Sequence, residues 1–290
     1  MKALTVISAF IDIRERREDC MKPNDKLVSD LQKMHEADLE RIKKFRLLDD
    51  DFMSKVFEDS ECAEILLKII LNRDDLKVQD VHVQHVIHNL QGRSIRLDIY
   101  AVDLEGKLYD IEIQRDDKGA GVKRARYNSS LLSANATDTG EEYNELRETY
   151  VIFITENDVL KGNLPIYHIE RVILENGELF YDEEHIIYVN SRIVDETTLG
   201  RLMHDFWCTD AGDMYNTVLA NRVRYFKEDV KGVEIMCKEM EKMRDETRKE
   251  LIIESIRKML KARITEKQIK QVYDVTDDEI EKIKAEVYDD

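Results

Sequence analysis

The chain contains 290 residues, of which 42% are hydrophobic and 37% charged, enough for one sizeable domain and an accessory one. Its formal net charge of −17 argues against a protein that coats nucleic acid with its whole surface, although a local basic patch beside an acidic site is compatible with it. The small number of helix breakers, two prolines and ten glycines, predicts long helices.

The cysteines and the apolar segments indicate where the protein resides. The cysteines lie far apart and form no C-x-x-C pair, so we expect a reducing cytoplasm rather than a disulfide framework or a zinc ribbon. The apolar opening MKALTVISAFIDI is followed directly by the charged residues 14–17, without a small-residue cleavage pattern, so we expect no signal peptide. No apolar run reaches the roughly 18 residues needed to span a bilayer, so we expect a soluble protein without a membrane partner.

The first third of the chain predicts helices followed by a strand. Residues 1–35 are weakly patterned and are predicted to form an N-terminal extension. A helical pattern begins at Glu36 and pauses before Asp50 and Asp51, either of which could cap the next helix. That helix continues to Ile70 with apolar residues at helical spacing, and a break over residues 58–61 would divide it in two. Alternating valines over residues 78–86 predict the first strand.

Residues 95–115, IRLDIYAVDLEGKLYDIEIQR, predict a β-hairpin. Strand-forming residues occupy both arms, and a short loop containing Gly106 joins them. The arms also carry acids, with Asp98 in the first and Glu112 between two isoleucines in the second. A carboxylate in an apolar strand is costly to bury unless it has a partner or a cation. The two arms therefore predict a binding site for a partner or a cation at these carboxylates.

The alternation of side chains along a strand predicts how these acids are arranged. A period of two places Asp110, Glu112 and Gln114 on one face of the second arm. Pairing of the arms can bring Asp98 beside Glu112, giving two oxygen donors that could share a divalent ion. We expect Asp103 and Asp110, near the ends of the arms, to flank the turn in solvent.

The elements after the hairpin predict the fold class. Residues 122–136 have an amphipathic helical pattern, and the apolar run over residues 150–155 is typical of a buried, parallel strand. The order helix, three strands, helix, strand predicts an α/β or α+β sandwich. Residues 167–174 and 186–189 could add an outer hairpin. We therefore predict an α/β domain over residues 36–205 and an all-helical C-terminal region over residues 206–290.

The last segment of the chain predicts three short helices. Thr265 and Thr276 have the sequence context of N-caps with capping boxes, and the helices could form a bundle of helix-turn-helix type. The last helix, residues 277–286, carries five acids, whereas a DNA recognition helix should meet phosphates with positive charge. We therefore expect an interaction or packing module, through which the chain could form a homo-oligomer.

The spacing of Asp98, Glu112 and Gln114 resembles the active-site signature of the PD-(D/E)XK nuclease superfamily. The phrases DDDFMSKVFEDSECAEILLKIILN, RLDIYAVDLEGKLYDIEIQRD and KRARYN resemble the Rpn family of recombination-promoting nucleases and putative transposases, over roughly residues 45–190. The resemblance implies a restriction-endonuclease-like αβββαβ core. It also implies that Asp98 and Glu112 bind Mg²⁺, or Mn²⁺ in its place, and that Gln114 helps to activate the attacking water for cleavage of DNA.

Physical reasoning agrees with this implication, and two residues depart from the signature. Phosphodiester hydrolysis needs a cation that polarises the phosphate and lowers the pKa of water, and two carboxylates on neighbouring strands would fix that cation. Leu97 stands where the signature has proline, and Gln114 stands where lysine is usual, so positive charge is missing there. Glutamine is what the resembling family typically carries. Two hypotheses follow: a metal-dependent DNA endonuclease, or a catalytically degenerate nuclease fold that binds DNA or protein.

Four residues that open the helix after the hairpin are candidates for DNA binding: Lys123, Arg124, Arg126 and Tyr127. They could form a phosphate-contacting patch that offsets the acidic surface, because phosphate contacts mainly position a nucleic acid. The alternative is a solvated helix face, which is what runs of charge usually form.

Two further groups of residues have a functional and a structural interpretation. Asp51 or Glu58 could add an acid to the site, as first-helix carboxylates do in some members of the superfamily, or could serve as a helix cap and a surface residue. His82, His85 and His88 could bind zinc, but their spacing of three on a strand cannot place all of them on one face. We expect surface histidines.

Overall fold

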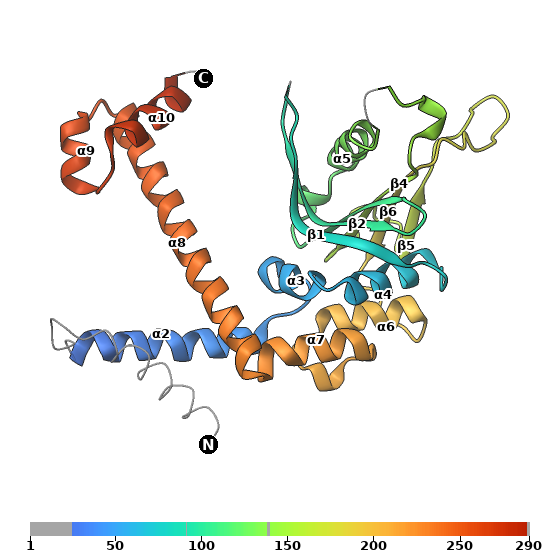
Figure 1. Cartoon of the computed structure of the whole chain (residues 1–290), viewed down its shortest axis with the longest axis horizontal. Helices are drawn as coiled ribbons and strands as arrows, with labels where there is room; N and C mark the ends of the chain where they lie inside the picture. Colours follow the sequence, from blue (N-terminus) through green and yellow to red (C-terminus); the bar gives the residue numbers. More distant parts are fainter. Residues whose placement is uncertain (1–24, 91, 138–139, 289–290) are drawn as a thin grey trace. The chain divides into compact units, whose positions relative to one another are not determined.

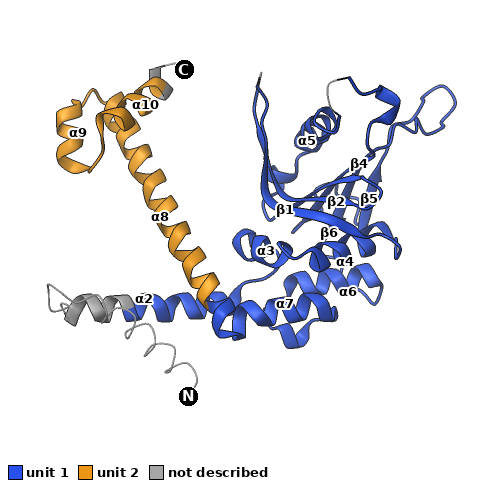
Figure 2. Ribbon diagram, viewed as in Figure 1, with its two compact units in different colours: residues 1–233 blue, residues 234–290 orange. Residues whose placement is uncertain are grey.

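The computed structural model describes residues 25–90, 92–137 and 140–288, so most of the predicted N-terminal extension lies outside the described residues. The chain divides into two compact units, residues 1–233 and 234–290 (Figure 2). The boundaries predicted from the sequence, at residues 35 and 205, stay predictions. Among the described helices, none is both long and apolar enough to cross a membrane.

The first unit is built on a six-stranded mixed sheet with helices on both faces (Figure 1). Its strands are β1 (Val78–Ile87), β2 (Ile95–Asp103), β3 (Leu108–Gln114), β4 (Thr149–Thr155), β5 (Ile166–Ile169) and β6 (Glu184–Asn190). Its α-helices are α2 (Asp25–Lys44), α3 (Asp50–Phe57), α4 (Ser60–Leu71), α5 (Val122–Ala134), α6 (Thr198–Trp207) and α7 (Thr217–Glu228). Short 3-10 turns are η1 (Asp117–Ala120), η2 (Tyr143–Glu145) and η3 (Ala211–Asp213).

The order of these elements confirms the predicted αβββαβ core. Strands β1, β2 and β3 pair antiparallel, and β4 pairs parallel to β3 after the crossover through α5. The predicted outer hairpin extends this sheet, because β6 pairs parallel to β4 and β5 lies antiparallel to β6 at the edge. Helix α5 packs on one face of the sheet, while α3 and α4 pack on the other with α6 and α7 behind them (Figure 1).

The start of the helical layer differs in detail from the prediction. The predicted break is present, since α3 ends at Phe57 and α4 begins at Ser60 with Asp59 as its N-cap. The N-cap of α3 is Asp49, whereas Asp50 or Asp51 was expected. Asp49 has extended backbone angles and its carboxylate accepts from the N–H of Arg46 at 2.8 Å, so the turn before the helix forms one residue earlier.

The second unit contains α8 (Val230–Lys261) except for its first four residues, together with α9 (Glu266–Val272) and α10 (Asp277–Tyr288). The predicted capping boxes are present: Thr265 exchanges bonds with Gln268, and Thr276 with Glu279. The first of the three predicted short helices is instead the end of one helix of 32 residues, because no proline or glycine interrupts it after Gly232. The unit's small core consists of Ile256, Leu260, Ile269, Ile280 and Ile283.

Asp103 organises the turn between β2 and β3, and the prediction that it lies in solvent is wrong. Its side chain is buried and accepts from the backbone N–H groups of Glu105 and Lys107, each at 2.9 Å. The hydroxyl of buried Tyr109 donates to its other oxygen at 2.7 Å. Gly106 supplies the positive φ of 84° that the loop requires. One carboxylate therefore fixes the hairpin that carries the candidate site.

Replacing Asp103 should destabilise the first unit. In Asp103→Ala, the Tyr109 hydroxyl and two turn N–H groups lose a charged acceptor, so we expect a loss of about 2–4 kcal/mol in the free energy of unfolding. Urea denaturation measures this loss. Glu105→Ala, which removes an exposed acid from the same turn, is the control and should change stability by less than about 0.5 kcal/mol. Equal stabilities for the two variants would contradict this role of Asp103.

Candidate active site

Strands β2 and β3 bring Asp98 and Glu112 to the same face of the sheet, the face that α5 covers. Tyr100 pairs with Asp110 across the two strands, so the residues two positions further along, Asp98 and Glu112, share the side on which Tyr100 and Asp110 lie. Glu112 is fully buried, and Asp98 is half-buried. The N–H of Ile113 donates to Asp98 Oδ2 at 3.1 Å, which fixes the first carboxylate against the second strand.

Gln114 links the two carboxylates through its amide. Its Nε2 group lies 3.4 Å from Asp98 Oδ2 and 3.2 Å from Glu112 Oε2. This arrangement directs the amide oxygen away from the acids, where Arg124 Nη1 donates to it at 3.4 Å. The structure thus brings together all three residues of the predicted signature.

Arg124 reaches into this group from the first turn of α5. Its Nη2 donates to Glu112 Oε2 at 2.5 Å, and its Nη1 donates to the carbonyl of Gly119 at 2.9 Å. The helix faces the sheet with the positions that follow Arg124 at helical spacing, including buried Asn128 and Leu132. These two contacts hold the guanidinium between η1 and β3. It therefore lies in the site and not on the exposed side of the helix.

Asp110 lies behind Glu112 in the interior, and the prediction that it lies in solvent is wrong. It is fully buried because strand alternation places it on the face of Glu112, which α5 covers. Asn128 Nδ2 donates to Asp110 Oδ2 at 3.1 Å. One oxygen of each acid, Asp110 Oδ1 and Glu112 Oε1, and the amide oxygen of Asn128 have no hydrogen-bond partner among the described residues while both acids are ionised. Such buried oxygens are costly and indicate a missing partner. A proton on one acid allows the hydrogen bond between Asp110 and Glu112 that acts on the pKa of Asp110.

The pKa values of Asp98, Asp110 and Glu112 are all raised above their usual range. Burial raises the pKa of Asp98 to about 6, of Asp110 to about 7 and of Glu112 to about 9. The charge of Asp98 raises the pKa of Asp110 and of Glu112, and the charge of Asp110 raises that of Glu112. A hydrogen bond with Glu112 lowers the pKa of Asp110, and the charge of Arg124 lowers the pKa of all three acids. The short contact between Arg124 and Glu112 indicates an ion pair, whereas the raised pKa favours the neutral acid. The neutral form of Glu112 is favoured, because one guanidinium cannot balance three carboxylates in this interior.

The donor set fits a hard divalent cation. Asp98 and Glu112 offer carboxylate oxygens on adjacent strands, and Glu112 Oε1 is buried without a partner. Mg²⁺ commonly takes one or two carboxylates and retains several waters, so two acids suffice. The oxygen of Asp110 that has a partner points to Asn128, and we assign this residue to the support of the site. Asp98 and Glu112 are therefore the residues that would hold the ion.

The other predicted DNA-binding residues lie outside this group. Lys123 and Arg126 are exposed on α5. Tyr127 contacts the loop between β1 and β2, because its hydroxyl donates to the carbonyl of Arg93 at 2.5 Å and accepts from Asn89 at 3.2 Å. Tyr127 thus holds that loop against the helix.

The first-helix acid that influences the site is Asp50, whereas the sequence predicts Asp51 or Glu58. The charge of Asp50 contributes to the raised pKa of Asp98, whereas Glu58 forms a surface ion pair with Lys55 at 2.7 Å. Arg115, at the end of β3, binds Asp49 at 2.7 Å and so holds the start of α3 beside the site. This ion pair joins residues that lie far apart in the sequence, so local sequence patterns cannot predict it.

Neither group of possible zinc ligands forms a convincing centre. In the described part of the chain, the only group of three or more histidine, cysteine or acidic side chains with closely placed ligand atoms consists of His204, Asp205 and Cys208. Both oxygens of Asp205 already accept backbone N–H groups, from Tyr215 at 2.7 Å and from Asn216 at 2.8 Å. Asp205 therefore organises the connection between α6 and α7. The predicted zinc alternative at residues 82–88 is not supported by any such convergence.

A divalent ion should stabilise the protein through Glu112. At an Mg²⁺ concentration about 100 times its Kd, binding stabilises the folded state by about 2.7 kcal/mol, which corresponds to an increase of about 5–10 °C in Tm. In chelator, Glu112→Gln should be about as stable as the wild type, because the raised pKa of Glu112 favours a neutral acid that the amide matches in shape. The variant should not respond to Mg²⁺. Differential scanning fluorimetry measures both effects, with Glu105→Gln as a control that responds normally. An equal Mg²⁺ response in Glu112→Gln would contradict this role.

Comparison with known proteins identifies the family of the chain, and its order of elements is consistent with that family. A family model described as PD-(D/E)XK nuclease family transposase matches residues 51–274, a range that contains Asp98, Glu112, Gln114 and Arg124. No curated protein and no solved structure matches the chain. Because the family model spans more than half of the sequence, the chain belongs to the PD-(D/E)XK nuclease family transposases.

Proposed function

We propose that the protein is a divalent-metal-dependent DNA endonuclease that hydrolyses phosphodiester bonds in a recombination-promoting or transposition-like process. The observation that carries this proposal is the pair of carboxylates, Asp98 and Glu112, fixed on adjacent strands with a buried oxygen of Glu112 left without a partner. A protein with no use for a cation would gain stability by replacing such a group with an apolar one.

Asp98 and Glu112 would hold Mg²⁺ or Mn²⁺. When bound, the ion would supply positive charge to the phosphate and would lower the pKa of the water that attacks it. The site's own residues would do the positioning. The N–H of Ile113 and the amide of Gln114 keep the two carboxylates on one side of the sheet, so that their geometry is set before substrate arrives.

Arg124 would supply the positive charge that Gln114 lacks. Gln114 occupies the place of the usual lysine of the signature, and the guanidinium of Arg124 lies against its amide oxygen at 3.4 Å. From this position a guanidinium can stabilise negative charge as it develops on the phosphate. The Gln114 amide would then orient water while Arg124 provides the charge, so that two residues share a role that one lysine usually fills.

The exposed cations of α5 would position the DNA backbone. Lys123 and Arg126 lie on the same helix as Arg124 and are exposed to solvent. Phosphate contacts of this kind are sequence-independent and confine attraction to one part of an otherwise acidic protein. Cytoplasmic residence and self-association through the C-terminal helices are part of the same proposal.

A catalytically degenerate nuclease fold that binds DNA or protein is the second candidate function. The contact between Arg124 and Glu112 at 2.5 Å favours it, because this ion pair partly satisfies the acid without a cation. The two candidates differ in whether a divalent ion displaces Arg124 from Glu112. They also differ in turnover, so a cleavage assay separates them.

Cleavage of supercoiled plasmid DNA tests the proposal. With Mg²⁺ or Mn²⁺, the wild type should nick or linearise the plasmid, and Asp98→Asn and Glu112→Gln should each lower the rate at least about 100-fold, because each removes a ligand of the ion. Glu105→Gln, an exposed acid in the same hairpin, should cleave like the wild type. Cleavage by both site variants at the wild-type rate would overturn the proposal. An inactive wild type that still binds DNA would favour the degenerate fold.

A pair of substitutions tests whether Arg124 supplies the positive charge while Gln114 orients the water. Arg124→Met should lower the cleavage rate at least about tenfold, since the loss of one charged donor to a transition state costs about that much or more. Lys123→Met, which removes an exposed cation from the same helix, should mainly weaken DNA binding. Adding Gln114→Lys to Arg124→Met should restore part of the rate, because the new ammonium replaces the lost charge. No recovery in the double variant would contradict the assignment.

A further inference from the structure

Three aromatic side chains on β1 and β2 gather beside the candidate active site. The imidazole ring of His85 stacks on the ring of Tyr100, with centroids 4.8 Å apart and planes at 20°. The ring of His82 lies 6.3 Å from that of Tyr100 and 5.8 Å from that of His85. We call His82, His85 and Tyr100 the aromatic ledge.

The ledge forms because β1 departs from regular alternation. His82 pairs with Tyr100 across the strands, so these two residues share a face. Strand period alone would place His85 on the opposite face, but Gln84 between them has a φ of 53°, and the rings of His82 and His85 lie together. The expectation that the histidines are surface residues holds for His88 and for His82, whose side chain is 52% exposed, whereas His85 is half-buried.

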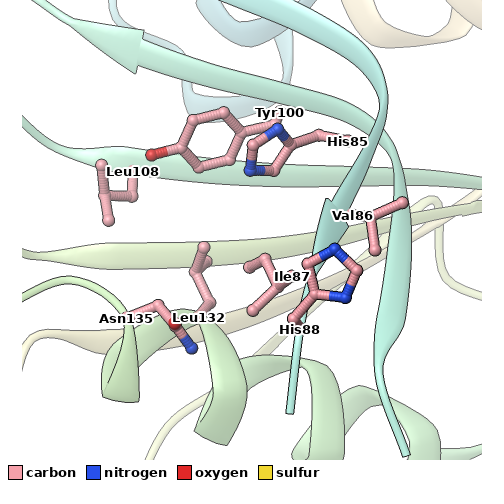
Figure 3. A pocket seen from close by; sticks show the side chains of 8 residues that line it. All are labelled: His85, Val86, Ile87, His88, Tyr100, Leu108, Leu132 and Asn135. Atoms are coloured by element: carbon pink, nitrogen blue, oxygen red, sulfur yellow. The ribbon is translucent and has the colours of Figure 1, made fainter. Parts of the chain in front are cut away.

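A cavity of about 380 Å³ opens next to the ledge, between the β1–β2 hairpin and α5 (Figure 3). The ring of His85 lies over Tyr100 on one side of it, and Leu132 and Asn135 of α5 face them from the other side (Figure 3). The remaining lining residues are Val86, Ile87, His88 and Leu108. Aromatic and polar side chains alternate with aliphatic ones around this cavity, and its volume lies within the range usual for ligand sites.

The ledge lies on the same face of the sheet as the carboxylates. Tyr100 pairs directly with Asp110, and it is two residues from Asp98 on β2, so its Cα lies about 7 Å from that of Asp98. A DNA strand whose phosphate reaches Asp98 and Glu112 would therefore bring a neighbouring nucleotide to the ledge.

The charges around the ledge suit a nucleotide within a strand. Burial and the neighbouring His82 both lower the pKa of His85, which keeps its imidazole neutral and able to stack. Arg147, exposed in the segment before β4, lies close enough for its charge to act on the Tyr100 hydroxyl. The carboxylate of Asp80 lies 2.8 Å from Nε2 of His82. The cavity thus combines stacking rings and hydrogen-bonding edges with a cation near its rim.

We propose that the aromatic ledge binds one unpaired nucleobase of the DNA strand, adjacent to the phosphate that is cleaved. The proposal rests on DNA being the substrate and adds a subsite to the proposed nuclease. Base stacking on tyrosine and histidine rings is how proteins commonly hold single-stranded nucleic acid, and it tolerates every base because each has a π-face. The protein would then prefer DNA with an unpaired segment, such as a gap, a flap or a melted end.

Equilibrium binding of a short single-stranded oligonucleotide to the full-length protein tests this subsite. Fluorescence anisotropy with Ca²⁺ in place of Mg²⁺ gives Kd without cleavage. Replacing one nucleotide at a time by an abasic residue should weaken binding about 10-fold to 100-fold at a single position, the range that stacking contributes. A 2-aminopurine placed at that position should be quenched when bound. A free nucleoside monophosphate should compete weakly, because it lacks the neighbouring phosphates of the strand.

Variants of the ledge complete the test. Tyr100→Leu and His85→Leu should each remove the effect of the abasic residue and weaken binding to intact single strands about tenfold, while Tyr100→Phe, which keeps the ring, should bind nearly as well as the wild type. His168→Leu, an exposed histidine on β5, is the matched control. The salt dependence of binding should not change in the ledge variants, because no phosphate contact is lost. Thermal unfolding checks that each variant is folded.

The possible results separate this proposal from the proposed function. Wild-type protein that cleaves DNA but shows no abasic effect and no 2-aminopurine quenching would overturn the subsite and leave the nuclease. Wild-type protein that shows both effects but never cleaves would support the subsite and overturn the nuclease. A wild type with no affinity for single-stranded DNA would overturn the subsite whatever its activity on duplex DNA.

Discussion

The structure of the site depends on the burial of three carboxylates that a single guanidinium cannot balance. Asp98, Asp110 and Glu112 lie on one face of two adjacent strands, and burial raises the pKa of each. Arg124 lowers these values only in part. A folded protein can keep such a group at modest cost if the acids take up protons or if a further positive charge joins them, and a divalent cation would supply that charge. Phosphodiester hydrolysis is a reaction in which the positive charge of a metal ion assists directly.

The surrounding fold holds this unfavourable group in place. Helix α5 supplies Arg124 to Glu112 and Asn128 to Asp110 from consecutive turns, so one helix both balances and orients the acids. Asp103 fixes the turn that sets the pairing of β2 with β3. The parallel strand β4 buries the other edge of β3, which keeps water from the backbone beside Glu112. The aromatic ledge extends the same face of the sheet, so binding of DNA and chemistry would share one continuous surface.

Local patterns in the sequence predicted the parts of the structure that depend on neighbouring residues. Strand alternation and the position of Gly106 predicted the hairpin and the common face of Glu112 and Gln114, and the capping boxes at Thr265 and Thr276 were confirmed. Asp103 and Asp110 were misplaced because acids near a turn were expected to be hydrated, whereas Tyr109 and Asn128 provide partners in the interior. Strand alternation places Asp110 on the same face as Glu112, so it predicts a buried Asp110 more accurately than the position of Asp110 near the turn does. The influence of Asp50 and the left-handed φ of Gln84 depend on tertiary packing, which no local pattern encodes.

The most direct test of this account is the position of a Mn²⁺ ion in crystals of the wild-type protein, located by anomalous scattering. The account predicts a peak bridging the carboxylates of Asp98 and Glu112, with Arg124 moved away from Glu112 Oε2, the atom that it contacts at 2.5 Å. The peak should be absent from crystals of Glu112→Gln grown under the same conditions. A wild-type crystal in which Arg124 stays on Glu112 and no anomalous density lies between the two acids at saturating Mn²⁺ would contradict the claim that this site is built for a metal ion.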